Sequence, residues 1–432
     1  MATAREIALE ELLRLEAAGQ YADRTLNAAL TRATALSPAD RGFLTHLFYG
    51  VIERRITLDA VIDARASIAP SAIERRVRML LRMGLYQLRY MDRVPDHAAI
   101  NETVNMTPRR SKGFVNAILR GFCRDGKEIP LPDVDKEPIR YLSVCYSVSP
   151  SVAECFLGIY GAERAAAVLD GFAAHPPITV RVNTLRLTRE EFLARVEGAT
   201  PTKLAPFGAV LPDGAPLHAL LGEGLCFVQD EASQIACAAL DAAPDMRVLD
   251  LCAAPGSKSF GAALSMKNTG TLCSFDLHEN KLSLIRDTAA KLGITNMTVA
   301  AADARTASAE RLGRFDRVIC DVPCSGLGVI GKKPDIRYKD MTASAGLLPV
   351  QRDILRAAAT CVAPGGVLVY STCTLLPEEN ERQVELFLSE HPDFALEGFA
   401  AGELSAPTGM LTLTPDVHQT DGFFIAKLRY KG

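Results

Sequence analysis

The chain has 432 residues, of which 48% are hydrophobic and 23% are charged, and its formal net charge is −3. This length exceeds one ordinary core and predicts two or three domains, and the composition excludes disordered and fibrous classes. No apolar run has membrane-spanning length, and the first residues lack the apolar core of a secretory signal, so we expect a cytoplasmic protein that does not enter membranes.

The eleven cysteines are scattered, and none forms the Cys-x-x-Cys pair of a zinc site. We therefore expect reduced thiols and no bound metal. The charge is unevenly distributed, because residues 1–130 contain 20 Lys/Arg against 15 Asp/Glu, or +5, which leaves −8 for the rest. This asymmetry indicates a basic module, whose charges either contact a nucleic acid or cover a solvated surface.

Residues 1–130 are predicted to form an all-helical domain. Apolar residues recur at helical spacing within residues 7–15, 43–51 and 77–85, and Ser37-Pro38 has the composition of a helix start. Its basic groups are Arg54-Arg55, Arg75-Arg76-Arg78 and Arg109-Arg110-Lys112. They are either ordinary helix surface or contacts to RNA phosphates. The proline-rich stretch that follows, residues 129–138, is typical of a linker.

Residues 139–228 predict a small α+β domain. A helix is expected from Pro150, then a β-branched strand over residues 178–183 and a helix over residues 188–196. Short strands are expected near residues 209–212 and 224–228.

Residues 229–432 alternate between strands and helices. Apolar strands are predicted at 247–251, 271–275, 297–301, 317–320 and 366–370, separated by helical segments such as 280–292 and 343–362. This pattern predicts a mostly parallel sheet with helices on both faces, a Rossmann-like α/β domain. A last strand is expected over residues 421–427.

A loop follows the first of these strands and leads into a helix, and it consists of Cys252, Ala253, Ala254, Pro255, Gly256, Ser257 and Lys258. It lacks the G-x-G-x-x-G spacing that cradles a pyrophosphate, which argues against NAD and FAD. The carboxylate of S-adenosylmethionine still gains from backbone N–H groups at a helix start. We therefore expect this loop to bind S-adenosylmethionine.

Two further acids stand where a nucleoside would lie. Asp276 ends the second strand, 26 residues after Asp250, and is placed to accept hydrogen bonds from both ribose hydroxyls. Asp303 follows the third strand and is placed to accept from the adenine amino group.

Asp321, Cys324 and Cys373 follow the fourth and fifth strands. Ligands bind at the carboxyl ends of such strands, so the two thiols, 49 residues apart, are expected to face one pocket. A thiol beside a cofactor indicates covalent catalysis, and a pair indicates that one thiol attacks while the other assists release. These residues leave open which thiol attacks.

Together these segments resemble the RNA cytosine-C5 methyltransferases that carry a NusB-like N-terminal domain. The matching segments are residues 181–186 (RVNTLR), 228–234 (VQDEASQ), 250–258 (DLCAAPGSK), 321–326 (DVPCSG), 333–337 (KPDIR), 371–373 (STC) and 421–424 (DGFF). In the first domain, residues 40–43 (DRGF), 49–51 (YGV) and 114–120 (FVNAILR) resemble NusB. The resemblance implies three parts, namely a NusB-like RNA-binding domain (1–130), an RRM-like domain (139–228) and a class I methyltransferase domain (229–432).

The resemblance also implies the roles of the site residues. Cys373 is the expected nucleophile, Cys324 assists release, and Asp321 binds the base near N3 and lies close to the methionine end of the cofactor. DNA cytosine methyltransferases attack with the thiol of a Pro-Cys pair, so Cys324 is the alternative nucleophile. Lys258 and nearby helix termini are expected to depress thiol pKa values.

The implied substrate is a cytosine in 16S ribosomal RNA of the small subunit. The alternatives are a transfer RNA or other RNA substrate, and a non-catalytic RNA-binding assembly factor. Some positions depart from the family pattern, namely Ser257, Ser259, Val322, Gly331-Lys332 and Thr374. Gly331-Lys332 replaces an expected Arg-His pair and leaves open how that loop contacts RNA.

Overall fold

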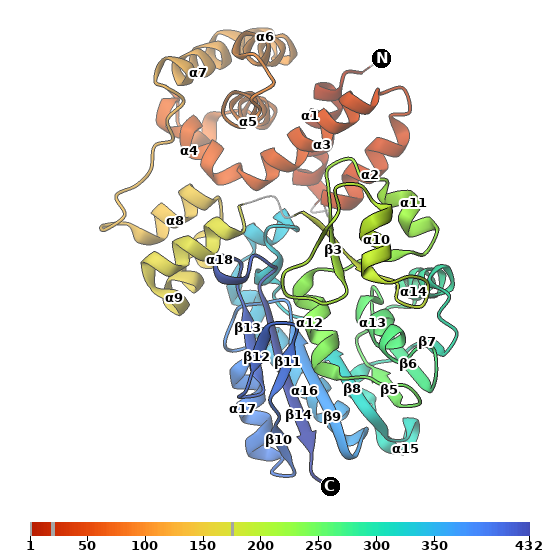
Figure 1. Ribbon diagram of the computed structural model, residues 1–432. Helices are drawn as coiled ribbons and strands as arrows, with labels where there is room; N and C mark the ends of the chain where they lie inside the picture. The colour runs from red at the N-terminus through yellow and green to blue at the C-terminus, as the bar shows by residue number, and fades with distance from the viewer. Residues whose placement is uncertain (1, 19–21, 174–176) are drawn as a thin grey trace. The chain divides into compact units, whose positions relative to one another are not determined.

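The computed structural model describes residues 2–18, 22–173 and 177–432 (Figure 1). It contains two compact units. The helical unit comprises Met1–Leu169 together with Lys333–Asp340, and the mixed unit comprises Asp170–Lys332 and Met341–Gly432. The finer division into domains at 1–130, 139–228 and 229–432 stays a prediction.

The helical unit is built from α-helices, as its periodicity predicts. They are α1 (Ala4–Ala18), α2 (Ala22–Arg32), α3 (Pro38–Glu53), α4 (Arg55–Arg65), α5 (Arg75–Tyr90), α6 (Asp96–Met106), α7 (Lys112–Arg124), α8 (Pro138–Tyr146) and α9 (Pro150–Gly171), whose last two residues lie in the mixed unit. Ser37 caps α3, because its hydroxyl accepts the N–H of Asp40 at 3.1 Å, and Pro38 opens the helix. This helix start is confirmed.

The core of the helical unit forms around α5. Val77, Leu80, Leu81 and Leu85 on this helix are at most 2% exposed. Gly50 of α3 allows close approach, since a Cβ there would lie 1.8 Å from the ring of Tyr86. Burial of such apolar side chains stabilises the unit by about 1.5–3 kcal/mol for each.

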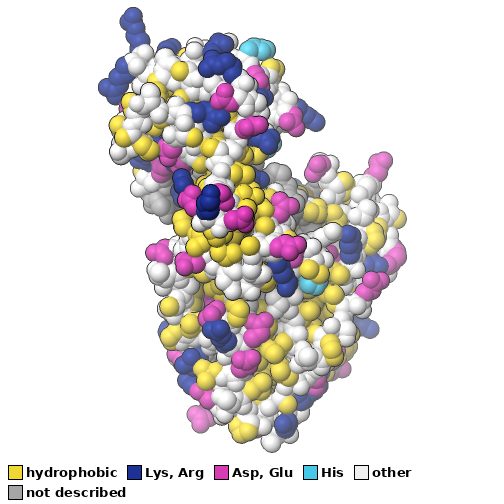
Figure 2. All heavy atoms as spheres, turned by 90° about the vertical axis from the view of Figure 1, so that its left-hand side faces the viewer, with side chains coloured by type: hydrophobic (Ala, Val, Ile, Leu, Met, Phe, Trp, Pro, Cys, Tyr) yellow, Lys and Arg dark blue, Asp and Glu magenta, His cyan; other side chains and the backbone are white. Residues whose placement is uncertain are grey.

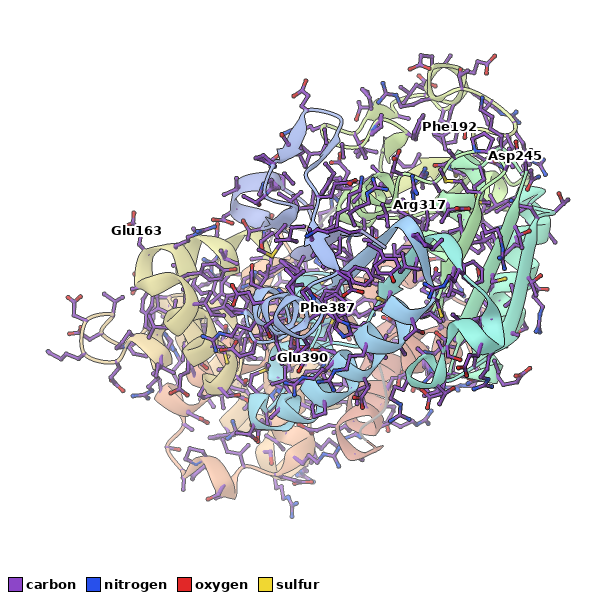
Figure 3. The ribbon with its side chains drawn as sticks, turned by 90° about the horizontal axis from the view of Figure 1, so that it is seen from below. Glu163, Phe192, Asp245, Arg317, Phe387 and Glu390 are labelled. Atoms are coloured by element: carbon purple, nitrogen blue, oxygen red, sulfur yellow. The ribbon has the colours of Figure 1, made fainter. Side chains whose placement is uncertain are left out.

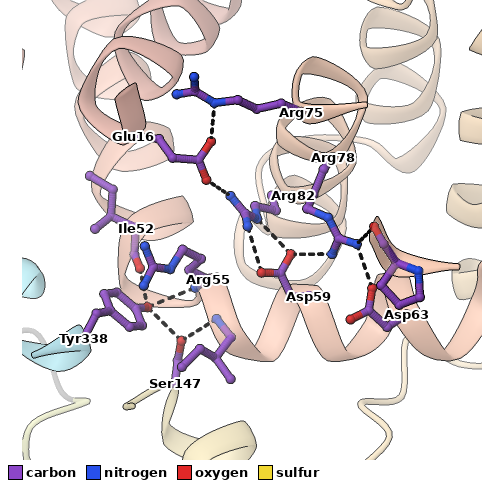
Figure 4. Close-up of polar contacts among 12 residues, drawn as sticks. Glu16, Ile52, Arg55, Asp59, Asp63, Arg75, Arg78, Arg82, Ser147 and Tyr338 are labelled. Carbon is purple, nitrogen blue, oxygen red and sulfur yellow. Dashed lines mark hydrogen bonds and ion pairs between the residues drawn. The ribbon is translucent and has the colours of Figure 1, made fainter. Parts of the chain in front are cut away.

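A short segment from late in the chain completes the helical unit. It contains the 3₁₀ helix η5 (Pro334–Tyr338), and Tyr338 binds this segment to the rest of the unit. The Tyr338 hydroxyl donates to the carbonyl of Ile52 and is 2.9 Å from the hydroxyl of Ser147 (Figure 4). The guanidinium of Arg55 lies over the Tyr338 ring, 3.8 Å from its centroid.

Within the described ranges, no single helix is long and apolar enough to cross a bilayer. Helices α8 and α9 pass that test only as a pair, and they are bent by 115° with respect to each other.

The mixed unit begins with a small antiparallel sheet. Its strands β1 (Ile178–Val182), β2 (Thr200–Pro201), β3 (Gly208–Leu211) and β4 (Cys226–Val228) lie in the order β2-β3-β1-β4. Two helices accompany it, α10 (Arg189–Arg195) and α11 (Leu217–Gly222). Thr188 and Glu191 form a capping box at the start of α10, so the helix predicted near residues 188–196 is confirmed.

The large sheet has eight strands. They are β5 (Arg247–Asp250), β6 (Thr271–Asp276), β7 (Met297–Ala301), β8 (Phe315–Asp321), β9 (Val362–Thr372), β10 (Phe394–Leu396), β13 (Met410–Leu413) and β14 (Phe423–Tyr430). The order is β10-β14-β9-β8-β5-β6-β7, with β13 beside β14. Strands β5 to β9 pair in parallel and β14 is antiparallel to β9, so the predicted mostly parallel sheet is confirmed.

Alternation along the central strands assigns side chains to two cores. Val248, Ile319 and Val367 pack with α12 (Glu231–Leu240), α13 (Ser257–Ser265) and α14 (Glu279–Leu292) on one face. Their neighbours Leu249, Val318 and Leu368 pack with α16 (Leu347–Thr360) and α17 (Glu381–Glu390) on the other. Both faces are therefore covered, which is the reason these strands are apolar throughout.

Helix α17 is held at two points along its length (Figure 3). The ring of Phe387 packs against Phe394, with centroids 5.3 Å apart, and Glu390 binds Arg356 of α16 at 2.8 Å. The remaining short elements are α15 (Ala309–Leu312), β11 (Phe399–Ala401), β12 (Leu404–Ala406) and α18 (Pro415–His418).

Candidate active site

The two predicted cysteines meet at the carboxyl edge of the large sheet. Asp321 ends β8 and is opposite Ser371 in β9, so the loops that follow these parallel strands start side by side. The sulfur atoms of Cys324 and Cys373 are 3.3 Å apart. The two thiols, 49 residues apart in the sequence, therefore lie side by side, and the pocket that they are expected to face stays a prediction.

Asp321 is held in place from both sides. One carboxylate oxygen accepts from the ammonium of Lys258 at 2.8 Å, and the other accepts from the hydroxyl of Ser371 at 2.9 Å. Burial opposes the charge of Lys258, but the charge of Asp321 and its hydrogen bond outweigh burial and raise the pKa of Lys258. Lys258 is therefore an ammonium ion that fixes the carboxylate of Asp321.

Lys258 lies in the first turn of α13 and is 7% exposed. Its ammonium also donates to the hydroxyl of Ser233 at 3.0 Å and lies 5.0 Å from the centroid of the Phe423 ring. A cation over an aromatic face is stabilised by the ring quadrupole. The Asp-Gly-Phe-Phe segment at residues 421–424 thus contributes a wall of this site.

The thiol of Cys324 does not have the depressed pKa that we expected. The hydrogen bond to Cys373 raises the pKa of Cys324, and burial and the charges of Cys373, Glu379 and Asp321 raise it further. The expected lowering of the Cys324 pKa was wrong. Lys258 forms its ion pair with Asp321, and the charged groups that act on Cys324 are acidic.

Sequence reasoning missed Glu379 and Gln351, which are buried next to the Cys324 loop. Glu379 is 1% exposed and accepts the N–H of Ser325, while Gln351 donates to Glu379 and to the carbonyl of Pro323. Neither residue belongs to a motif or a strand end. Only the unusual burial of an acid identifies Glu379.

The loop at residues 252–258 follows β5, as predicted. Asp250 at the end of β5 accepts from the N–H of Cys252 at 3.2 Å and from the hydroxyl of Ser259 at 2.7 Å. Burial raises the pKa of Asp250 to about 6. Ser259 replaces the threonine that is usual in the family, and it still supplies the hydroxyl for this bond.

Asp276 ties the loop to the next strand. Its two carboxylate oxygens accept the N–H of Ala254 at 3.1 Å and the N–H of His278 at 3.0 Å. Each oxygen keeps a further acceptor position, which is what a pair of ribose hydroxyls requires. Gly256 has a positive φ of 108°, a conformation that favours glycine at this tight turn. The donor and acceptor set therefore fits S-adenosylmethionine.

The carboxylate of Asp303, predicted to bind the adenine amino group, is already bound by Arg305. The guanidinium and backbone N–H of Arg305 donate to both of its carboxylate oxygens, at 2.6–3.1 Å. The hydrogen bonds from Arg305 lower the pKa of Asp303. Its contact with adenine stays a prediction and requires Arg305 to release part of the carboxylate.

Lys332, at the position that departs from the family pattern, is bound within the mixed unit. Its ammonium donates to Asp230 at 2.5 Å and to Asp421 at 2.8 Å. Burial opposes this charge, but the two carboxylates outweigh it and raise the pKa of Lys332. The lysine therefore joins three segments of the mixed unit through ion pairs.

Four of the eight basic residues predicted in the helical unit form ion pairs, and two of these, Arg75 and Arg78, are labelled in Figure 4. Arg75 binds Glu16, Arg76 binds Glu10, and Arg110 binds Glu74, at 2.6–2.8 Å. Arg78 binds Asp59 and Asp63. On the face drawn in Figure 2, Lys and Arg are interspersed with Asp and Glu rather than forming one continuous basic field.

Comparison with known proteins gives two family matches. The family model described as 16S rRNA methyltransferase RsmB/F matches residues 237–429, and the NusB family model matches residues 2–124. The probable ribosomal RNA small subunit methyltransferase B of Bacillus subtilis (strain 168) is 38% identical over 446 residues, which cover 99% of each chain.

Solved structures agree with the observed architecture. The crystal structure of PH0851 is 27% identical, covers 99% of both chains and has a TM-score of 0.78. The crystal structure of NSun6 from Pyrococcus horikoshii with SFG is 22% identical, covers 65% of this chain and 98% of its own, and has a TM-score of 0.58. The predicted fold, a NusB-like helical part followed by a Rossmann-like methyltransferase domain, is confirmed.

Proposed function

Because this chain belongs to the RsmB/F family of S-adenosylmethionine-dependent rRNA methyltransferases, we propose that it methylates C5 of one cytosine in 16S rRNA through a covalent bond between Cys373 and C6. The observation that carries this proposal is the pair of sulfur atoms 3.3 Å apart, beside Asp321 with its bound Lys258.

Cytosine C5 is a weak nucleophile, and covalent catalysis increases its reactivity. Addition of the Cys373 thiolate to C6 makes C5 an enamine carbon, which is reactive enough to accept a methyl group. S-adenosylmethionine supplies that methyl group when bound. The loop at residues 252–258, with Asp276, Asp303 and Asp321, would hold it.

Asp321 would stabilise the adduct by its hydrogen bond to the base edge near N3. The carboxylate is already oriented by Lys258 and Ser371, so little reorganisation is needed when the base arrives. The target base must be unpaired or flipped out to reach this edge of the sheet.

In the release step the C5 proton passes to solvent water, the electron pair of the C5–H bond forms the C5=C6 double bond, and the electron pair of the C6–S bond returns to Cys373. Cys324 would assist this step as a neutral thiol that donates a hydrogen bond to the departing sulfur, which lies 3.3 Å from its own sulfur. Pro323 precedes it and restricts the backbone at this point.

Incubation of purified protein with unmodified 16S rRNA and S-adenosylmethionine, followed by bisulfite sequencing, tests the proposal. We expect protection of one cytosine from deamination. Parallel reactions with transfer RNA and 23S rRNA serve as controls. Methylation of transfer RNA alone, or of no cytosine in any RNA, would contradict the proposal.

A further inference from the structure

A buried polar cluster connects the two cysteine loops. We call it the Glu379 cluster, and its members are Ser325, Gln351, Thr374, Glu379 and Asn380. All five residues are at most 1% exposed. The large majority of polar groups buried this deeply are hydrogen-bonded.

Glu379 holds the backbone on both sides of Cys324. One of its oxygens, Oε2, accepts the N–H of Ser325 at 2.9 Å and the side-chain amide of Gln351 at 2.7 Å. The same amide of Gln351 donates to the carbonyl of Pro323 at 2.9 Å. The residues before and after Cys324 are therefore fixed by one carboxylate and its amide partner.

The same cluster reaches the Cys373 loop. Asn380 donates to the carbonyl of Thr374 at 3.0 Å, and the hydroxyls of Thr374 and Ser325 are 2.6 Å apart. The backbone carbonyl of Glu379 accepts from Tyr370 of β9 at 2.6 Å. Because both loops are bound to one segment, the separation of the two sulfur atoms depends on it.

Glu379 also brings a charge close to Cys324. Its Oε2 accepts hydrogen bonds from two N–H donors, and its Oε1 has no hydrogen-bond partner among the described residues. The titratable groups that act on or face Cys324 are Cys373, Glu379, Asp321 and Tyr370. All of them are neutral or negative, so the ionised form of Cys324 is disfavoured.

Cys373 has a different partner. Lys258 interacts electrostatically with Cys373 as well as with Asp321, and an ammonium favours a thiolate. The chemistry of the two thiols is otherwise the same, so their surroundings must decide which one attacks.

We propose that Glu379 is the positioning residue that assigns the roles of the two cysteines. It fixes the backbone around Cys324 and keeps that thiol protonated, and Cys373 is thereby left as the nucleophile. This inference rests on the proposed function of the cysteine pair.

The first test measures alkylation of Cys324 by iodoacetamide between pH 6 and 11, followed by mass spectrometry of the peptide that contains it. Glu379→Gln should lower the midpoint of the pH profile by about one unit, the size of shift that a neighbouring charge produces. Glu378→Gln is the matched control, because Glu378 is the adjacent acid, is 46% exposed and binds Arg382. A midpoint equal to that of the wild type in Glu379→Gln would overturn the charge role.

The second test remains decisive if Glu379→Gln does not fold. Gln351→Met keeps the Glu379 side chain and removes both hydrogen bonds of the amide, the one to Pro323 and the one to Glu379. We expect kcat for RNA methylation to fall about tenfold, as for a displaced catalytic group, with KM for RNA unchanged. A wild-type kcat would overturn the positioning role.

The two tests separate this inference from the proposed function. Alkylation uses no RNA, so a wild-type protein that fails to methylate cytosine would refute the proposed function, whereas the effect of Glu379 on Cys324 would still be measured.

Discussion

Cys373 and Cys324 carry the same functional group in different electrostatic surroundings. The ammonium of Lys258 interacts with Cys373, whereas the charge of Glu379 acts on Cys324. The thiolate is the reactive form of cysteine. The proposed order of roles, with Cys373 attacking first, is consistent with these surroundings and stays a proposal.

Replacement of the nucleophile should remove activity. Cys373→Ala is expected to lower methyl transfer to 16S rRNA by on the order of 10³-fold or more, because the covalent step has no substitute. Transfer of tritium from labelled S-adenosylmethionine measures this. Cys361→Ala is the control, since Cys361 precedes β9 and so lies at the opposite edge of the sheet from Cys373. Turnover of Cys373→Ala close to that of Cys361→Ala would refute the assignment.

Replacement of the releasing thiol should trap the reaction. Cys324→Ala is expected to accumulate a protein–RNA adduct that survives denaturing gel electrophoresis, because the C6–S bond forms but breaks slowly. Cys324→Ala combined with Cys373→Ala should show no such band. An adduct of equal intensity in that double variant would assign the attack to another residue.

At the scale of elements, ion pairs join the region of the edge strand β10 to its neighbour β14 in the large sheet. Glu397, just after β10, binds Lys427 at 3.0 Å and Arg429 at 2.5 Å, and both of these residues lie on β14. The hydrogen bond from Arg429 lowers the pKa of Glu397 to about 2, from its usual value near 4.5. A carboxyl group whose pKa is lowered on folding stabilises the protein only when it is ionised.

Glu397→Gln should therefore destabilise the protein in a pH-dependent way. We expect a loss of about 1–2 kcal/mol at pH 7, allowing for solvent screening of this partly exposed group. The stabilisation is complete above about pH 4.5 and is lost as the pH falls from 4.5 towards 2. Thermal melts at pH 7, 4 and 3 check this, with Glu403→Gln in the exposed turn between β11 and β12 as control. A pH-independent difference between Glu397→Gln and the wild type would contradict the ion-pair account.

At the scale of the whole molecule, net charge is a poor guide to the RNA-binding surface. The first 130 residues carry +5, yet arginines such as Arg75, Arg76 and Arg110 are paired with acids in the same unit. Exposed ion pairs of this kind are weak, so RNA phosphates can compete for them. Arg109 is exposed and has no ion pair in the described part of the chain, which makes the start of α7 the better candidate for phosphate contact.

Point substitutions test this surface without disturbing the helical unit. Arg109→Gln with Lys112→Gln should weaken 16S rRNA binding and reduce the slope of log affinity against log salt by about one for each lost phosphate contact. Filter binding at several salt concentrations measures the slope. Arg76→Gln is the comparison, because Arg76 is already paired with Glu10 and is expected to contribute less to phosphate binding. An unchanged slope in the double variant would assign these charges to solvent. Deletion of residues 1–130 is less informative, because it removes the partners of Tyr338.

The sequence by itself determined the helical first part, the parallel strands β5 to β9, the last strand β14, and the positions of the candidate catalytic residues along them. Strand and helix periodicity, the cap at Ser37, and the thiols after two neighbouring strands are local patterns, and they need only the spacing of residues along the chain. The carboxyl edge of the sheet as the site follows from them, because parallel strands end together.

Only the tertiary structure decided what surrounds each catalytic group. Lys258 binds Asp321 instead of lowering the pKa of Cys324, and Glu379 is buried against a loop 54 residues earlier in the chain. Hydrogen bonds and charges act over a few ångströms in space, between residues that no local pattern relates. For this reason the sequence identified the two thiols, while the folded chain distinguished them.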